Sequence, residues 1–446
     1  MLTVKRGNGV MTSSRLKIRQ PSKGLAVQRL SDLIKRNRCR IALVLGTSLL
    51  GSCAFTDSNR SIVLKVAQAS KENEQRSINR FESERTISKD FQQQLKEMQP
   101  GIKLHPSIYA EESLEQELKV QTNSGLGPDL VITNSNQALS LAADGLTDPI
   151  KLTKELENLI NPAALERVKT ASGALAGQPV SQYLQLACFD KRKLKKAPKT
   201  LKELSTASGN GQVFGMVTNL QDLYWSLGSF GAGKALTASL AGQKVTVAAH
   251  ERLTQWMRWL KESSYQQNIV FLRNQAALRK AFIEGEMNWI SCWSSQLPQL
   301  REKLKDHLGI APLPSGEFGR ATPITRLQVW ALGKNSSRRQ RAESLNLLDF
   351  MVQPWAQKTY ALKYRTGFPV NPAAAMIVSK QLPPGFSKFS EDENKRVSRG
   401  DAIVSAIDAK PRLKKDIQST LNELIFDGLS PENAATELET QMKAKR

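Results

Sequence analysis

Short apolar stretches typical of buried strands alternate with longer amphipathic stretches in the first part of the chain. Residues 62–67, 102–108 and 129–133 are rich in β-branched and aliphatic side chains, as strands are. Residues 71–98 and 111–122 lie between them and carry polar and charged side chains with few helix breakers, which predicts helices. Strands that alternate with helices indicate βαβ units and a mostly parallel sheet.

The same alternation restarts further along the chain. The helix predicted over 251–263 places Trp256 and Trp259 at helical spacing, which favours a core position for both rings. Residues 338–351 and the tail from Asp401 onward predict further helices. The additional strands are predicted at residues 182–189, 211–217, 287–291, 309–314 and 327–332. A chain of 446 residues with this pattern exceeds one core of ordinary size, so two lobes are expected.

The N-terminal region has the pattern of an export signal. Residues 1–40 are strongly basic, residues 41–50 are apolar but too few to span a bilayer, and Gly51-Ser52-Cys53 follows. This arrangement resembles the bacterial lipobox, in which the cysteine is lipidated and becomes the mature N-terminus. We therefore expect a signal peptide over 1–52, lipidation of Cys53 and a tether over 53–60.

The formal net charge of +23 raises the possibility of nucleic-acid binding, but its distribution argues against it. Much of the charge lies in the predicted signal peptide, and the cluster of basic residues over 191–196 is typical of a solvated helix face. No zinc-finger spacing or RNA-binding aromatic signature accompanies it. Cys188 and Cys292 are interpreted as unpaired buried cysteines, with a disulfide between them left open.

A series of short motifs, in collinear order, resembles the family 1 extracellular solute-binding proteins of bacteria, which include maltose- and other sugar-binding proteins. The matching motifs are GLGPDLV at 125–131, AADGLTDP at 142–149, GQP at 177–179, FDK at 189–191, PKTLKEL at 198–204, FIEGEMNWISCW at 282–293 and SPENA at 430–434. The resemblance implies the α/β two-lobed periplasmic-binding-protein fold of type II. It implies an N-lobe of residues 61–185 plus 313–372 and a C-lobe of 186–312 plus 373–446, joined by crossing strands.

The same resemblance suggests where a ligand would bind. Residues 219–225 are similar to a sugar-contacting segment of the family, which implies that Asp222 accepts hydroxyl hydrogen bonds and Tyr224 stacks on a sugar ring, with Trp225 beside it. The alternative is a surface helix start capped by Asp222. Trp293 follows an apolar strand where the family has a stacking tryptophan, although a core position is the alternative.

Two further segments are expected at the ligand. Asn134, Ser135 and Asn136 follow the strand over 129–133, so they should open into the cleft between the lobes. This loop lacks the aromatic and the acid of maltose-binding protein, which argues against maltodextrin itself. Arg326 is expected to pair with an acidic ligand or to donate to hydroxyls, and a position on the solvated surface is the alternative.

Two other patterns are set aside. Residues 228–234 have the spacing of a phosphate-binding loop, but Ala235 stands where magnesium coordination needs Ser or Thr, which favours ordinary turn glycines. His105, His250 and His307 have no metal-ligand spacing. We therefore expect no metal, no cofactor and no enzymatic activity.

Together these observations predict a monomeric, lipid-anchored periplasmic protein. Its expected function is to capture a sugar, a polyol or a glycosylated compatible solute and to deliver it to the permease of an ABC importer. The alternatives are the same fold binding a phosphorylated glycerol or other non-sugar solute, and a signalling lipoprotein that has lost transport.

Overall fold

A computed structural model describes residues 61–70, 93, 95–97, 99, 101–364, 367–381 and 391–444. The predicted signal peptide, the tether and Cys53 lie outside the described residues, as does most of the helix expected over 71–98. The sections below concern the compact unit that begins at Asn59.

The described strands follow one hydrogen-bonded order, β2-β1-β3-β10-β5-β8-β6-β7, and three short strands pair at the side of this path. Strands β1, β2 and β3 are parallel, as the alternation with helices predicts. The strands form two groups, which meet at β5. The first group consists of β1 (Ile62–Ser70), β2 (Ile102–Ala110), β3 (Leu130–Thr133), β4 (Thr147–Asp148), β10 (Thr325–Gly333) and β11 (Phe368–Pro369). Those of the second group are β6 (Phe214–Val217), β7 (Ile269–Leu272), β8 (Trp289–Trp293) and β9 (Leu308–Ala311).

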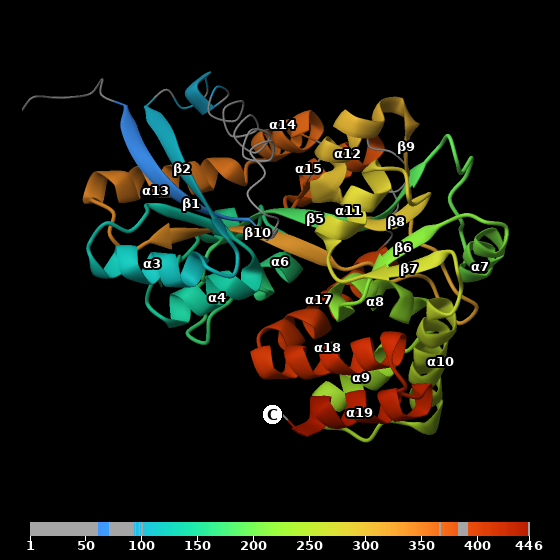
Figure 1. Cartoon of the computed structure of the whole chain (residues 1–446). Helices are drawn as coiled ribbons and strands as arrows, with labels where there is room; N and C mark the ends of the chain where they lie inside the picture. The colour runs from blue at the N-terminus through green and yellow to red at the C-terminus, as the bar shows by residue number, and fades with distance from the viewer. Residues whose placement is uncertain are drawn as a thin grey trace, which may run out of the picture. The chain divides into compact units, whose positions relative to one another are not determined.

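Strand β5 (Gln178–Asp190) belongs to both groups. Its first part, to Leu184, pairs antiparallel with β10, and its second part, from Gln185, pairs with β8 and β9. Figure 1 shows β5 running from the strands of one lobe to those of the other. The predicted boundary between residues 185 and 186 falls inside this crossing strand.

Helices α4 and α13 of the first lobe pack on β10, and α13 also packs on β1. Residue Asn134 caps α4 by accepting a hydrogen bond from the Gln137 amide, and Gly125 adopts a φ of +74° just beyond α3, a conformation that favours glycine. Core residues such as Leu64, Leu130 and Leu348 are fully buried here. The helices of this lobe are α3 (Leu114–Asn123), α4 (Ser135–Ala143), α5 (Lys154–Glu157), α6 (Pro162–Glu166) and α13 (Arg338–Met351). Two further helices, α14 (Pro354–Tyr364) and α15 (Pro372–Gln381), pack on each other and on β11.

The second lobe has the larger core, and Trp256 lies fully buried in it, as its helical spacing predicts. The C-terminal helices α18 and α19 pack against α10 and bring the end of the chain back onto this core (Figure 1). The α-helices are α7 (Leu201–Gly209), α8 (Leu220–Ser229), α9 (Gly233–Leu240), α10 (Val247–Ser264), α11 (Gln275–Ile283), α12 (Leu297–Leu304), α17 (Glu391–Asp408), α18 (Pro411–Phe426) and α19 (Pro431–Ala444). Two 3-10 helices, Ser294–Gln296 and Lys305–His307, flank α12.

A disulfide joins Cys188 on β5 to Cys292 on β8, so the interpretation as unpaired cysteines is wrong. The two strands are neighbours, with Leu186 opposite Cys292 and Cys188 opposite Ile290, and the two Cα atoms lie 5.8 Å apart. This separation is within the range that a disulfide spans. Strand register brings the two positions together across 104 residues, and sequence spacing alone does not reveal it.

One glycine of the segment that mimics a phosphate loop, Gly228, and Gly316 on a segment that packs against it allow close backbone approach. The chain between β9 and β10 returns past the end of α8, and Gly316 lies directly against the Ser229 carbonyl. A side chain at Gly316 would collide with that oxygen, and one at Gly228 would collide with Thr322. Glycine is therefore needed for close backbone approach on both segments.

Candidate binding site

A cavity of about 1650 Å³ is lined by residues of both lobes. The first lobe contributes the start of α4, and the second contributes the starts of α8 and α11 together with part of α17. The beginning of β10, next to the crossing strand, forms its floor. A concave site of this size at strand ends is where α/β folds commonly bind small molecules.

The start of α4 lies at the cavity wall, and all three residues predicted there line it. The Asn134 side chain donates to Glu111 Oε1 at 2.7 Å while its oxygen caps the helix. Ser135 is nearly buried. Asn136 accepts a hydrogen bond of 2.7 Å from the Ser405 hydroxyl on α17, which belongs to the other lobe.

Asp222 also lines the cavity, but its carboxylate is already occupied by protein donors. Oδ1 accepts hydrogen bonds from Trp293 Nε1 at 2.6 Å and from Gln275 Nε2 at 3.0 Å. Oδ2 accepts one from Asn219 Nδ2 at 2.6 Å. Arg326 Nη2 lies 3.7 Å from Oδ1, and the Asp222 side chain is only 2% exposed. Such an arrangement fixes neighbouring side chains, and it leaves little acceptor capacity for the two ligand hydroxyls that the sequence suggested.

Arg326 points into the cavity and lies on the ring of Trp293, with its guanidinium carbon 3.8 Å from the ring centroid. Its Nη2 donates to Gln221 Oε1 at 2.7 Å. Burial lowers the pKa of Arg326, and the nearby Asp222 carboxylate acts in the opposite direction. The Trp293 ring is 1% exposed and lies behind the arginine, so the stacking surface predicted for a ligand is covered by a cation instead.

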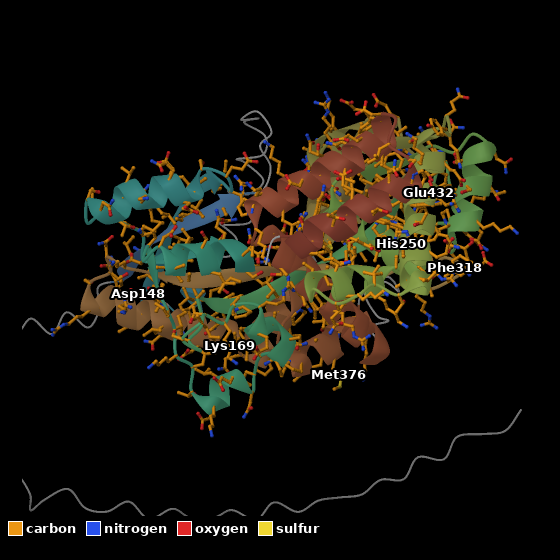
Figure 2. The ribbon with its side chains drawn as sticks, turned by 90° about the horizontal axis from the view of Figure 1, so that it is seen from below. Asp148, Lys169, His250, Phe318, Met376 and Glu432 are labelled. Atoms are coloured by element: carbon orange, nitrogen blue, oxygen red, sulfur yellow. A yellow bond between two sulfur atoms is a disulfide. The ribbon has the colours of Figure 1, made fainter. Side chains whose placement is uncertain are left out.

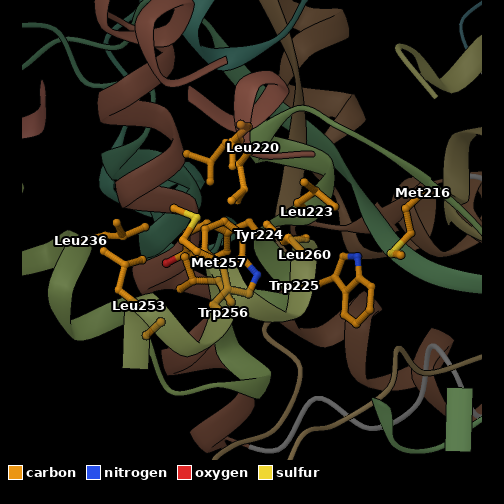
Figure 3. Close-up of a cluster of buried hydrophobic side chains, with 14 of the residues drawn as sticks. Met216, Leu220, Leu223, Tyr224, Trp225, Leu236, Leu253, Trp256, Met257 and Leu260 are labelled. Carbon is orange, nitrogen blue, oxygen red and sulfur yellow. The ribbon is translucent and has the colours of Figure 1, made fainter. Parts of the chain in front are cut away.

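Tyr224 and Trp225 lie in the core of the second lobe and do not line the cavity. Figure 3 shows both among the buried side chains around Trp256. Burial raises the pKa of Tyr224. The ligand-contact role predicted for these two residues disagrees with this placement. The reason is that residues 219–225 start a helix, in which the second residue after Asp222 points about 200° away from it.

Several cavity residues were not predicted from the sequence. Tyr183 on β5 receives a hydrogen bond of 3.0 Å from Gln328 Nε2, and burial raises the pKa of Tyr360 to about 12. Strand alternation was the sequence signal that could have indicated Tyr183. It places alternate residues of 182–189 on the same face of the strand. The unpredicted aromatic and amide residues include Tyr183, Gln221, Gln275, Gln296, Gln328, Trp330 and Tyr360.

Most of the cavity's cations have carboxylate partners from the protein. Arg167 Nη1 lies 2.9 Å from Asp401 Oδ2, and burial raises the pKa of that carboxyl. Lys414 Nζ lies 2.9 Å from Asp408 Oδ1. Glu115, which also lines the cavity, accepts a hydrogen bond from the Ser140 hydroxyl. The positive charges of the lining are therefore largely compensated by protein carboxylates.

Two classes of feature are absent from the part of the chain that the structure describes. No group of three or more histidine, cysteine, aspartate or glutamate side chains there is arranged to hold a metal ion. Among the same residues, none of the helices combines the length and apolar character that crossing a membrane requires.

Two α/β lobes that share a crossing strand and enclose a cavity define a two-lobed solute-binding fold, which confirms the predicted fold class. Solved structures with this fold include a cyclo/maltodextrin-binding protein complexed with maltotetraose (16% identity, TM-score 0.62, covering 87% of this chain and 98% of that one). The maltose-bound MalE3 of T. maritima has 16% identity and a TM-score of 0.63, covering 86% of this chain and 100% of that one. MalX of Streptococcus pneumoniae, in complex with maltopentaose, has 16% identity and a TM-score of 0.62, with the same coverage.

Residues 87–386 match the family model described as bacterial extracellular solute-binding protein. The chain therefore belongs to this family, which confirms the family resemblance seen in the sequence motifs. A search of curated proteins finds no significant match.

Proposed function

We propose that this chain is the substrate-binding subunit of an ABC importer and that it captures an uncharged, hydroxyl-rich solute, a sugar or a polyol. One observation carries the choice of solute. The cavity presents amide, hydroxyl and aromatic groups, while its two enclosed cations, Arg167 and Arg326, lie beside protein carboxylates, and the more exposed Lys414 pairs with Asp408. Planar amides suit paired hydroxyls, and aromatic rings suit the apolar faces of sugars.

The charges argue against the alternative of a phosphorylated solute. A phosphate beside Arg326 would also lie near the Asp222 carboxylate, 3.7 Å from the guanidinium. Glu111 and Glu115 would face it from the first lobe. Repulsion from these carboxylates would offset the attraction of one compensated arginine in a partly desolvated cavity. A neutral ligand avoids this repulsion.

Within this cavity we propose Asn134, Ser135, Asn136, Gln221, Gln328 and Arg326 as the hydrogen-bonding contacts, with Tyr183, Trp330 and Tyr360 as the aromatic surfaces. All of these residues line the cavity. Asp222 and Trp293 are proposed to act indirectly, because they hold Arg326 and Gln275 in place. The sugars bound in the similar structures named above agree with this proposal, and the similarity itself shows a shared fold.

We further propose that the mature protein is a monomer, exported and anchored to the membrane through Cys53, and that it delivers its ligand to a permease. The buried disulfide supports an oxidising compartment, since such bonds persist outside the cytosol. Membership of an extracellular family agrees with export.

A thermal-shift screen tests the choice of ligand. The panel contains maltotetraose, sorbitol, a glucosylated glycerol and glycerol 3-phosphate, each well above an expected micromolar Kd. A ligand at 100 times its Kd adds about 2.7 kcal/mol of stability, which gives a clear rise in Tm. We expect a rise with at least one neutral compound and none with glycerol 3-phosphate. A rise with glycerol 3-phosphate alone would support the phosphorylated alternative instead.

A further inference from the structure

A buried ion pair joins the two lobes at the edge of the cavity. Arg167 lies one residue beyond α6, and its neighbour Val168 belongs to a core cluster of the first lobe. Asp401 lies on α17, where Ile403 and Val404 pack into the core of the second lobe. The pair therefore connects elements that are anchored in different lobes, and both residues line the cavity.

Both charged groups also bind Thr325, the first residue of β10. Asp401 Oδ1 accepts from the Thr325 amide at 2.6 Å, and its Oδ2 accepts from the Thr325 hydroxyl. Arg167 Nη2 donates to the Thr325 carbonyl at 2.9 Å, and Nη1 donates to the Thr325 hydroxyl at 2.8 Å. The amide, the carbonyl and the hydroxyl of Thr325 are thus all held by the pair.

The residue after Thr325 is Arg326, the cation that points into the cavity. Fixing the Thr325 backbone sets the direction in which the next side chain leaves the strand, because successive residues of a strand point to opposite faces. A second contact between the same lobes, from the Ser405 hydroxyl to Asn136 Oδ1, lies one helical turn further along α17. A change in the separation of the lobes would therefore directly affect two side chains of the cavity, Arg326 and Asn136.

We infer that Arg167 and Asp401 are a positioning pair that fixes the start of β10, and with it Arg326, and that couples this position to the separation of the lobes. The inference rests on the proposed function only in taking this cavity as the binding site. It does not depend on which solute binds. Its direct readouts are accordingly measured without a ligand.

The substitution Asp401→Asn keeps the size of the side chain but removes its charge and one of its acceptors. Arg167 then lies buried without a carboxylate, and an unpaired buried charge is strongly unfavourable, so it is expected to draw in water and release Thr325. Arg167→Lys keeps a positive charge beside Asp401 but cannot bond both the carbonyl and the hydroxyl of Thr325, because its ammonium lacks the guanidinium fork.

A matched control is available on the surface of the second lobe. Arg258 Nη2 lies 2.8 Å from Glu432 Oε1, a spacing similar to that of the buried pair, but both side chains are about half exposed. Figure 2 shows Glu432 at the surface. Arg258→Gln breaks this exposed pair, which should contribute little.

Amide hydrogen exchange of the unliganded protein, combined with small-angle X-ray scattering, tests the inference. In Asp401→Asn we expect exchange over residues 324–328 to rise at least tenfold, while exchange in the core strand β6 stays unchanged, and the radius of gyration to change. Arg167→Lys should give the same local rise, smaller in size, and Arg258→Gln should give neither change.

Two outcomes would overturn the inference. One is unchanged exchange over 324–328 and unchanged scattering in a folded Asp401→Asn protein. The other is a uniform rise in exchange that includes β6, which would mean a role in global stability only. Should Asp401→Asn not fold, the same two criteria apply to Arg167→Lys. Absence of binding to every neutral compound in the ligand screen would contradict the proposed function and leave these measurements unaffected.

Discussion

At the scale of single residues, the Asp222 carboxylate holds several side chains of the cavity wall, because its hydrogen bonds come from protein donors. Asp222 connects Trp293, Gln275, Asn219 and Arg326, so several side chains at the wall depend on one buried charge. Its substitution should affect folding as well as any ligand.

Asp222→Ala removes this acceptor and leaves Arg326 without its nearest carboxylate. We expect the free energy of unfolding to fall by about 3 kcal/mol, the range found when one partner of a buried charge pair is removed. Urea denaturation followed by circular dichroism measures the change. Asp222→Asn retains the shape and most hydrogen bonds, so its loss should be smaller. Equal stability of Asp222→Ala and the parent protein would show that Asp222 has no such role.

The pH dependence of stability should depend on Asp190. Hydrogen bonds from the Arg192 side chain hold the pKa of this buried carboxyl below its ordinary value. In the pH range below that ordinary value, the unfolded chain binds the proton more readily than the native state. The stabilisation from Asp190 is therefore fully present above the unfolded pKa and is lost as the pH falls through the lower, folded pKa.

Arg192→Gln tests this account of acid stability. Without the guanidinium, the pKa of Asp190 should rise toward its ordinary value, so the variant should be less stable near pH 7 and should lose less stability on acidification than the parent. Urea midpoints between pH 3 and pH 7 measure the difference, and Arg258→Gln serves as the surface control. Parallel curves for the parent and Arg192→Gln would exclude Asp190 as the source.

Sequence reasoning at this scale predicted positions at the cavity where a residue directly follows a strand end or begins the next element, while the role of these residues in ligand binding stays a prediction. Asn134, Ser135, Asn136 and Arg326 line the cavity for that reason. It failed for Tyr224 because the rotation of a helix turned the ring into the core. The covering of Trp293 by Arg326 depends on contacts between residues 33 positions apart, which no local pattern records.

At the scale of elements, the periods of apolar residues predicted most strands and helices, with errors at their ends. The strand expected over 182–189 is longer at both ends, as β5, because it continues through a second sheet. The strand expected over 287–291 lies two residues later, at Trp289–Trp293. The partners of a strand are determined by the whole fold. Local sequence patterns therefore could not predict the pairing of β5 with β8 or the disulfide that depends on it.

Removing the disulfide should weaken the junction of these two strands. In the variant Cys188→Ala/Cys292→Ala we expect the free energy of unfolding to fall by about 2–5 kcal/mol, as is typical when a native disulfide is lost. Differential scanning calorimetry and urea denaturation measure the loss. Treatment of the parent with a reductant under denaturing conditions, followed by refolding, should reproduce it. A double variant as stable as the oxidised parent would contradict a stabilising role.

At the scale of the whole molecule, the two lobes were predicted from two runs of strand and helix and from the collinear family motifs. The cavity between them could not be derived in detail, because α17 and the start of β10 meet there from positions 76 residues apart. Sequence reasoning also placed α14 and α15 on either side of the predicted boundary at 372. In the structure, Ala361 of α14 and Val378 of α15 share a core cluster with Leu278 of the second lobe.

The proposed lipid anchor at Cys53 leads to one further prediction. Cys53→Ser should prevent lipidation, so the protein should accumulate uncleaved or be released in soluble form when cells are fractionated. Metabolic labelling with a fatty-acid analogue measures the acylation directly, and the parent protein is the labelled control. A Cys53→Ser protein that is cleaved normally and still sediments with membranes would contradict the lipid anchor.

The order in which the cysteines cross the membrane during export determines how the Cys188–Cys292 bond can form. Of the four cysteines in the chain, Cys39 would be discarded with the signal peptide and Cys53 would be blocked by acylation. The emerging chain would then contain one thiol, at position 188, with no correct partner until another 104 residues have crossed the membrane. A single oxidation completes the covalent structure, and no wrong intramolecular pairing exists to be rearranged. Folding of the exported chain should therefore require an oxidase but no disulfide isomerase.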